Sequence, residues 1–196
     1  MSTDSSLQDL SLSGITRALC GRVPKLSEDR HTGRAAVAVI LHAVEDTDAS
    51  VLIIERTQRD GDPWSGDLAF PGGRLEPADA HEQATAERET FEEVGLDLSA
   101  CPVLGRLDDR TARVQPLTVS AFVYQLDVVP GFVLSDEVAR TVWVPLADVV
   151  DRDRQCAHGD YPAVDLLGPG RPLLWGVTYH FLCLLLQRSP ETDCIL

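Results

Sequence analysis

The sequence predicts a single α/β (α+β) domain, in which strands and helices contribute to one core. Three observations support this prediction. Apolar runs of strand length occur at residues 34–44, 51–56, 119–124 and 141–146. Segments with helical character occur at residues 14–20, 88–95 and 174–187. The length of 196 residues suits one ordinary domain, and the contents of 44% hydrophobic and 24% charged residues are typical of globular proteins.

The chain begins with a segment rich in Ser, Asp and Leu over residues 1–13, for which we expect a loose tail. Ile15, Ala18 and Leu19 then have helical spacing, which predicts a short amphipathic helix within 14–20. Residues 34–44 are apolar on both faces, as is typical of a strand buried in a sheet.

Residues 51–56 supply the partner of that strand after a polar hairpin loop through Asp48. A polar loop at 57–67 and a short strand at 68–70 come next. The sequence Phe70-Pro71-Gly72-Gly73 then predicts a tight glycine turn, where the backbone can approach a ligand closely.

The second half contains further strands and an apolar helix. Strands are predicted at 102–106, 114–128 and 141–146, with a capped turn or loop at 135–140. The remaining elements are a short helix at 147–153, a polar loop around 159–160, a segment at 161–167 that leads into a glycine turn, and a helix at 174–187 that packs on the sheet.

Three glutamates share one face of the helix predicted at 88–95. Glu89, Glu92 and Glu93 stand at i, i+3 and i+4, within a single turn. Like charges at this spacing destabilise a helix by about 0.2–0.5 kcal/mol per pair, and Arg88 precedes Glu92 in the less favourable order. A hard divalent cation such as Mg²⁺ or Mn²⁺ prefers oxygen ligands of this kind. The cluster therefore predicts a metal site.

The alternative interpretation is a solvated helix face, which most acidic runs form. Two neighbouring features favour the metal site. Gly72 and Gly73 lie directly upstream, and Gly95 follows the glutamates at the position of a C-terminal glycine cap. The segment therefore predicts a loop, then a helix, and then the end of that helix at Gly95.

The segment from Gly73 to Leu96 resembles the signature of the Nudix hydrolase family: a glycine, five residues, an acid, and then Arg-Glu-x-x-Glu-Glu-x-Gly with an aliphatic residue. The second half matches at Arg88, Glu89, Glu92, Glu93, Gly95 and Leu96. In the first half Asp79 replaces the usual glutamate, and one extra residue precedes the arginine. This expansion, Thr90 after Arg-Glu, and Trp175-Gly176-Val177-Thr178 are similar to the coenzyme A pyrophosphatase branch.

The resemblance covers about residues 35–188 and implies a mixed β-sheet sandwiched between α-helices. Residues 1–34 would then be an N-terminal tail with a short helix, and 189–196 a C-terminal tail. The family's chemistry implies that water attacks one phosphorus of a nucleoside diphosphate derivative and breaks the diphosphate bond. The branch implies coenzyme A or acyl-CoA as substrate, with 3′,5′-ADP and (acyl-)4′-phosphopantetheine as products, although Asp62 stands where that branch has an arginine.

The resemblance also implies roles for individual residues. The expected metal ligands are Glu89, Glu92, Glu93 and the backbone carbonyl of Gly73. The expected catalytic residues are Glu92, Glu93, Glu137 and Arg88. The expected substrate contacts are Gly72, Arg56, Trp64 and Phe70.

The sequence alone leaves some of these roles open. The general base is either a glutamate of the helix or Glu137, which with Val138 resembles a Glu-Val pair ahead of a Val-Pro-Leu strand. Trp64 and Phe70 suit the core as well as a pocket, and Arg88 suits a tether for the glutamates. Asp79 is expected in the first turn or cap of the helix, where a negative charge is favourable.

The net charge of −14 argues against a general nucleic-acid binder and against an anionic membrane partner. An anionic small molecule would need local neutralisation by metal and arginine, and the chain has 16 arginines but one lysine. We therefore expect a small-molecule nucleotide as partner, and leave a homodimer open. The five cysteines are widely spaced and no secretory signal is visible, so we expect a reducing, cytoplasmic compartment.

Two other functions compete with coenzyme A hydrolysis. The first is the same chemistry on ADP-ribose or another nucleoside diphosphate derivative. The second is a Nudix-like module that binds a nucleotide without hydrolysing it, and the intact glutamates favour the hydrolase over this module.

Overall fold

The centre of the molecule is a mixed eight-stranded sheet. A computed structural model describes residues 9–29, 33–45, 47–59, 61, 65–112 and 117–188. The main path of the sheet runs in the order β3 (Leu68–Ala69), β2 (Ser50–Arg56), β1 (Gly33–His42), β7 (Leu117–Gln125) and β5 (Val103–Arg106). In addition, β4 (Gly72–Arg74) pairs with β1, β6 (Arg110–Ala112) with β7, and β8 (Val138–Pro145) with β2. The two middle strands, β1 and β7, are parallel, and the other pairings are antiparallel.

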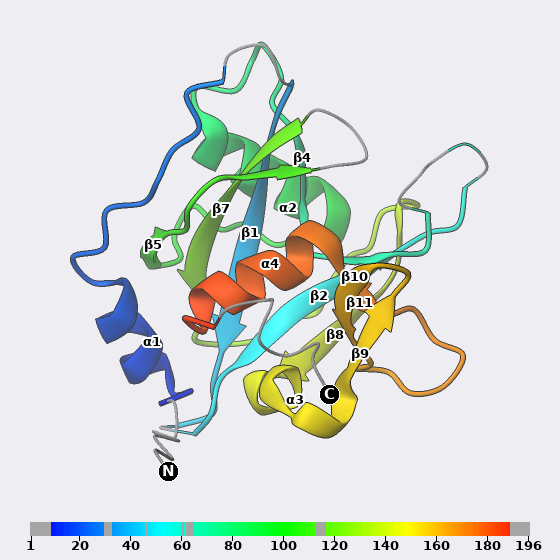
Figure 1. The fold of residues 1–196 in the computed structure, drawn as a ribbon. Helices are drawn as coiled ribbons and strands as arrows, with labels where there is room; N and C mark the ends of the chain where they lie inside the picture. The colour runs from blue at the N-terminus through cyan, green and yellow to red at the C-terminus, as the bar shows by residue number, and fades with distance from the viewer. Residues whose placement is uncertain are drawn as a thin grey trace.

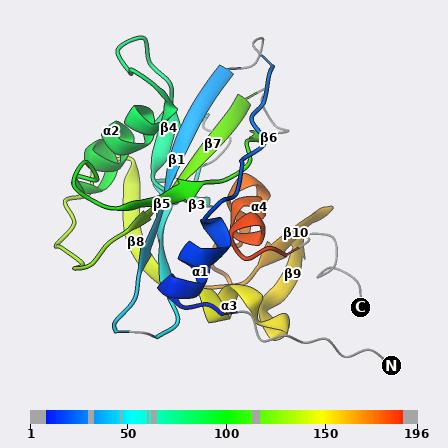
Figure 2. The same cartoon turned by 90° about the vertical axis from the view of Figure 1, so that its left-hand side faces the viewer.

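Helices cover both faces of this sheet. α2 (Glu82–Val94) lies on one face, and α4 (Gly176–Leu185) lies on the other together with α1 (Leu12–Leu19) and α3 (Leu146–Val150) (Figures 1 and 2). The strands are apolar on both faces for this reason: Ile40 and Leu52 point into the core on the α2 side, whereas Leu41 and Ile53 point into the other core. The predicted mixed sheet between helices is confirmed.

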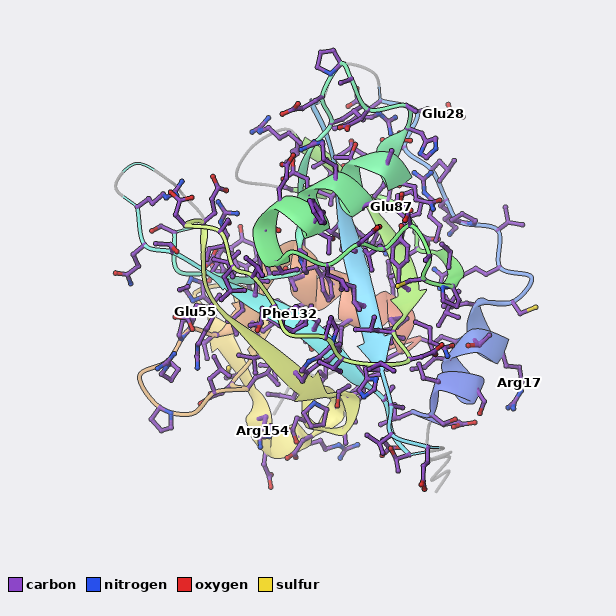
Figure 3. The ribbon with its side chains drawn as sticks, turned by 180° about the vertical axis from the view of Figure 1, so that it is seen from behind. Arg17, Glu28, Glu55, Glu87, Phe132 and Arg154 are labelled. Atoms are coloured by element: carbon purple, nitrogen blue, oxygen red, sulfur yellow. The ribbon has the colours of Figure 1, made fainter. Side chains whose placement is uncertain are left out.

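The α2 face also receives a loop that follows β7. In Figure 3, Glu87 on α2 and Phe132 on this loop lie over the sheet. Phe132 packs against the core beneath α2, and Tyr124 of β7 donates a hydrogen bond to Oε1 of Glu87 at 3.0 Å. Helix and loop are therefore both attached to the same sheet face.

A second, three-stranded sheet lies beside one end of α4 (Figure 1). It consists of β9 (Gln155–His158), β10 (Tyr161–Val164) and β11 (Leu174–Trp175), with β10 in the middle. Val164 and Leu174 on one face are completely buried in the core. This sheet was not predicted, and the helix predicted from residue 174 begins at Gly176 because the two residues before it pair with β10.

Other predicted boundaries also differ from the structure. β8 begins at Val138 rather than at 141, because its pairing with β2 continues as far as Arg56. Gly72 and Gly73 form no isolated turn but belong to β4, opposite Val37 and Ala36 of β1. Residues 1–8 and 113–116 lie outside the described residues. At the other end of the predicted tail, the side chain of Ser11 caps α1, which therefore starts at Leu12.

The ends of α2 are defined by two different caps. His81 is the N-cap, and its Nδ1 accepts a hydrogen bond from the backbone N–H of Ala84 at 3.1 Å. Gly95 ends the helix in the left-handed conformation with φ of 71°, as predicted. The prediction that Asp79 caps the helix is wrong, because the cap is His81 and the Asp79 carboxylate is bound to Arg88 of the second turn.

None of the helices in the described part of the chain is long and apolar enough to cross a membrane.

Gly72 cannot be replaced without strain. Its φ is 152°, and a Cβ atom at this position would lie 2.3 Å from the backbone oxygen of Ala36. We expect Gly72→Ala to lower the free energy of unfolding by about 2 kcal/mol or more. Urea unfolding followed by circular dichroism measures this loss.

The matched control for this substitution is Gly131→Ala. A Cβ atom on Gly131 would meet no atom within 4 Å, and its φ is not positive. This variant should be as stable as the parent chain. Equal unfolding midpoints for the two variants would contradict the strained position at Gly72.

Candidate active site

A cleft of about 710 Å³ opens between α2, β4 and the C-terminal sheet. This volume lies within the range of small-molecule sites. The acidic part of its wall comes from α2 and from the loop before β8, and the aromatic part from β10 and β11. The predicted site residues that line it are Arg56, Phe70, Gly72, Gly73, Arg88, Glu89, Glu92, Glu93 and Glu137.

Glu93 is the most deeply buried acid of the cleft. The residue is 4% exposed, and the backbone N–H of Gly72 donates to its Oε2 at 2.9 Å. Nη1 of Arg56 lies 3.9 Å from its Oε1. Burial raises the pKa of Glu93 to about 7, although the Gly72 hydrogen bond and Arg56 both act to lower it. A second cation near Glu93 would keep this carboxylate ionised at neutral pH.

Glu89 lies against the other glycine of β4. A Cβ atom on Gly73 would come within 2.4 Å of the Glu89 carboxylate, so the missing side chain makes room for it. Burial raises the pKa of Glu89, and Arg88 acts in the opposite direction. The two glycines thus bring the backbone of β4 next to two carboxylates of α2.

Arg88 is the centre of an ion-pair network. It binds Asp79 in a bidentate manner, with Nε–Oδ1 and Nη2–Oδ2 distances of 2.9 and 3.0 Å. The same guanidinium reaches Glu89 and Glu92 at 3.0 Å each and the backbone oxygen of Arg74 at 3.2 Å. Asp79 raises the pKa of Arg88 further, and Arg88 holds the pKa of Asp79 well below its usual range. These contacts match the predicted tether for the glutamates.

The three glutamates differ in exposure. The Glu92 side chain is 56% exposed, against 19% for Glu89 and 5% for Glu93. Within the described residues, no three His, Cys, Asp or Glu side chains are grouped closely enough to form a metal site by themselves. The donor set nevertheless fits a hard cation, because two partly desolvated carboxylates flank a glycine strand at the wall of the cleft.

Glu137 also lines the cleft, from the loop before β8. Nη1 of Arg59 donates to Oε1 of Glu137 at 3.2 Å, and Nη2 binds Asp136 at 2.8 Å. The loop that carries this glutamate is fastened to the end of α2, since the N–H of Ser135 donates to the carbonyl of Glu93 at 3.0 Å. The negative charge of Glu137 also acts to raise the pKa of Glu93, so the two carboxylates are electrostatically coupled.

The predicted substrate contacts have different surroundings. Arg56 is three-quarters buried beside Glu93 and carries positive charge into the cleft. Phe70 reaches the cleft wall but is 2% exposed and belongs to the core. Trp64 lies outside the described residues.

The aromatic part of the cleft wall was not predicted from the sequence. Nε1 of Trp175 donates to Oδ1 of Asp67 at 3.2 Å, and Tyr161 and Trp175 both line the cleft. Thr178 of the same Trp-Gly-Val-Thr segment lines the cleft too. Asp67 could not be assigned because its partner stands 108 positions away in the sequence.

A family model described as a NUDIX domain matches residues 32–167 of the chain. The chain belongs to the Nudix hydrolase family. The fold agrees with this family. A bifunctional NMN adenylyltransferase/ADP ribose pyrophosphatase from Francisella tularensis matches with a TM-score of 0.51 at 17% identity, over 82% of this chain and 42% of that one.

Two curated sequences are also similar to this chain. The human mitochondrial coenzyme A diphosphatase NUDT8 is 35% identical over 174 residues, which are 83% of this chain and 71% of the human protein. The Schizosaccharomyces pombe protein C14C4.10c is 36% identical over 150 residues, which are 65% of this chain. The matched region is about half of the yeast protein, at 46% of its length.

The raised pKa of Glu93 predicts a pH-dependent effect on the stability of the Nudix domain. The ionised carboxylate is disfavoured in the fold, so the stability that the protonated form provides is lost as the pH rises toward and beyond about 7. In the presence of a chelator, Glu93→Gln should therefore be more stable than the parent chain at pH 8, by about 1–3 kcal/mol. Urea unfolding at pH 4.5 and pH 8 measures the difference, which should disappear at the lower pH.

Glu92→Gln serves as the control, because Glu92 directly precedes Glu93 in the helix but its side chain is more than half exposed. We expect a change of less than about 1 kcal/mol at both pH values. A Glu93→Gln variant that is less stable than the parent chain at pH 8 would show that ionised Glu93 stabilises the fold.

Proposed function

We propose that this Nudix protein is a metal-dependent pyrophosphohydrolase that cleaves coenzyme A or acyl-CoA to 3′,5′-ADP and (acyl-)4′-phosphopantetheine. The observation that carries the proposal is the pair of desolvated carboxylates, Glu89 and Glu93, beside the glycine strand β4 in a cleft of small-molecule size. Two observations support the choice of coenzyme A. The human relative is named a coenzyme A diphosphatase, and Trp175-Gly176-Val177-Thr178 lines the cleft.

The metal of this proposal is Mg²⁺ or Mn²⁺. Glu89 and Glu93 would hold it, with Glu92 and the Gly73 carbonyl as further ligands. When bound, such an ion neutralises charge on the diphosphate oxygens and orients water and leaving group. Arg88 holds Glu89 and Glu92 in place through ion pairs, and Arg56 supplies a positive charge for a phosphate oxygen.

The reaction needs a group that takes a proton from water. The water oxygen forms the new bond to phosphorus, and the bond from that phosphorus to the bridging oxygen breaks. In this proposal Glu137 takes the proton, because its carboxylate lines the cleft and Arg59 holds it there. Glu93 is the other candidate base, because its carboxylate also lines the cleft, beside Gly72 of β4.

The bounds of the catalytic unit, the cellular location and the oligomeric state are also part of the proposal. The catalytic unit would comprise residues 35–188, although α1 of the preceding segment contributes Ile15 and Leu19 to the same core. A cytoplasmic location and a homodimer remain hypotheses.

Replacing the buried carboxylate tests the catalytic assignment. We expect Glu93→Gln to lower kcat by about a hundredfold or more, because it removes a charge that holds the metal. The initial rate with coenzyme A and Mg²⁺ or Mn²⁺ is the measurement, and excess chelator should abolish the parent activity. Glu87→Gln is the matched control, since Glu87 lies on the same helix but binds Tyr124 outside the cleft. An unchanged rate for Glu93→Gln would remove the assigned role.

A substrate panel tests the choice of coenzyme A. Coenzyme A, acetyl-CoA, ADP-ribose and diadenosine polyphosphates are incubated separately with the protein and Mn²⁺, and the products are identified by mass spectrometry. We expect 3′,5′-ADP from the first two. Turnover of ADP-ribose without turnover of coenzyme A would support the alternative substrate class, and binding without turnover of any substrate would support a nucleotide-binding module.

A further inference from the structure

One face of the C-terminal three-stranded sheet carries a cluster of aromatic rings. Tyr161 of β10 stands opposite His158 of β9, and Ala163 of β10 stands opposite Trp175 of β11. Side chains two residues apart on a strand share a face, so the three rings of His158, Tyr161 and Trp175 lie on the same side of the sheet. We call this group the aromatic face. The other side of the sheet points into the core through Val164 and Leu174.

The indole of Trp175 is held in a fixed orientation. The His158 ring stacks on it with a centroid distance of 4.4 Å and an interplanar angle of 24°. The Tyr161 ring lies tilted beside it at 5.7 Å, and Asp67 accepts the hydrogen bond of the indole N–H. Tyr161 and Trp175 are part of the cleft wall whereas His158 is not, so the imidazole supports the indole from a side that a ligand does not occupy.

The aromatic face lies close to the acidic part of the cleft. Asp67, which binds the indole, and Gly72, which binds Glu93, are five positions apart in the sequence. Five extended residues span about 17 Å at most. A ligand with a flat ring at one end and a diphosphate at the other can therefore contact both parts of one cleft.

We propose that Trp175 and Tyr161 form a stacking platform for the nucleobase of the substrate. This inference rests on the proposed function, and it assigns the base to the aromatic face and the diphosphate to the carboxylates of α2. Flat aromatic rings stack on any nucleobase.

The polar groups around the rings favour a base over an acyl or pantetheine chain. The Asp67 carboxylate, the Thr178 hydroxyl and the His180 imidazole all line the cleft along with the two rings. The ring nitrogens and amino group of adenine can hydrogen-bond to such groups. An alkyl chain would remove them from water without replacing their hydrogen bonds, which is unfavourable.

A matched pair of ligands tests the platform. The α,β-methylene analogue of ADP carries a base and is not hydrolysed at the bridge, and methylenediphosphonate carries the same bridge without base or ribose. Isothermal titration calorimetry with Mg²⁺ gives the Kd of each. We expect Trp175→Leu to raise the Kd of the ADP analogue about ten- to hundredfold, in line with the contribution of one stacked base. The Kd of methylenediphosphonate should change less than about twofold, and Trp175→Phe should restore most of the affinity for the ADP analogue.

Trp143→Leu is the control, because Trp143 is an indole of β8 that is absent from the cleft wall. It should leave both dissociation constants unchanged. Thermal unfolding shows whether each variant folds, and Tyr161→Leu provides the same test if Trp175→Leu does not fold.

Three results would overturn the platform. They are an unchanged Kd for the ADP analogue in both platform variants, equal weakening of both ligands, and a parent chain that binds the ADP analogue no more tightly than methylenediphosphonate. A failure of the proposed function looks different, because none of the nucleotides in the substrate panel would then be cleaved while the ADP analogue still bound.

Discussion

The burial of the Glu93 carboxylate against β4 is the constraint on which the rest of the site depends. Its Oε2 accepts the N–H of Gly72 at 2.9 Å, which fastens the last turn of α2 to the edge of β4. Gly72 can make this contact only because it has no Cβ atom to collide with Ala36 of the neighbouring strand. A carboxylate in such surroundings costs free energy, and proteins tolerate that cost mainly at functional sites.

Arg88 makes the acidic helix tolerable. Three acidic groups, Asp79, Glu89 and Glu92, lie around its guanidinium, so the repulsion within the glutamate cluster is offset by one cation. The planar fork suits this position, because two of its N–H groups bind Asp79 while others remain for the glutamates. Glu93 lies outside this network, and its nearest cationic contact is Arg56 at 3.9 Å. The network therefore divides the cluster into acids held by Arg88 and one acid held by the backbone of β4.

Local signals in the sequence predicted those parts of the molecule that depend on neighbouring residues. The α2 helix and its glycine cap at Gly95 follow from short-range patterns, and β1 and β2 follow from continuous apolar runs of strand length. The acid cluster could also be predicted, because Glu89, Glu92 and Glu93 lie within one turn of a single helix. The role of Asp79 was wrong, because position alone suggested a cap, whereas Arg88 forms a stronger bond to it than a helix N-terminus could.

Contacts between distant segments could not be predicted from the pattern. The aromatic face requires the pairing of β9, β10 and β11, and the short β11 merges in the sequence with the apolar run of α4. Likewise, Arg59 and Glu137 are 78 positions apart, and no periodicity links them. The acidic wall of the cleft was thus visible in one stretch of sequence, while the aromatic wall and the position of Glu137 emerge only from tertiary structure.

The parallel pairing of the two middle strands has a consequence for how the chain folds. Gly33 of β1 stands opposite Leu117 of β7, so the hairpin partner β2, the strand β4 and the helix α2 all belong to the loop that this pairing closes. Closing so long a loop is entropically costly and slows folding. During synthesis, a nascent chain that has not yet reached β7 exposes one unpaired edge of β1, with apolar side chains on both of its faces. The cleft, whose wall includes Leu117 and Val119 of β7, should therefore be completed late, and the interval before β7 docks is when the chain is most prone to aggregate.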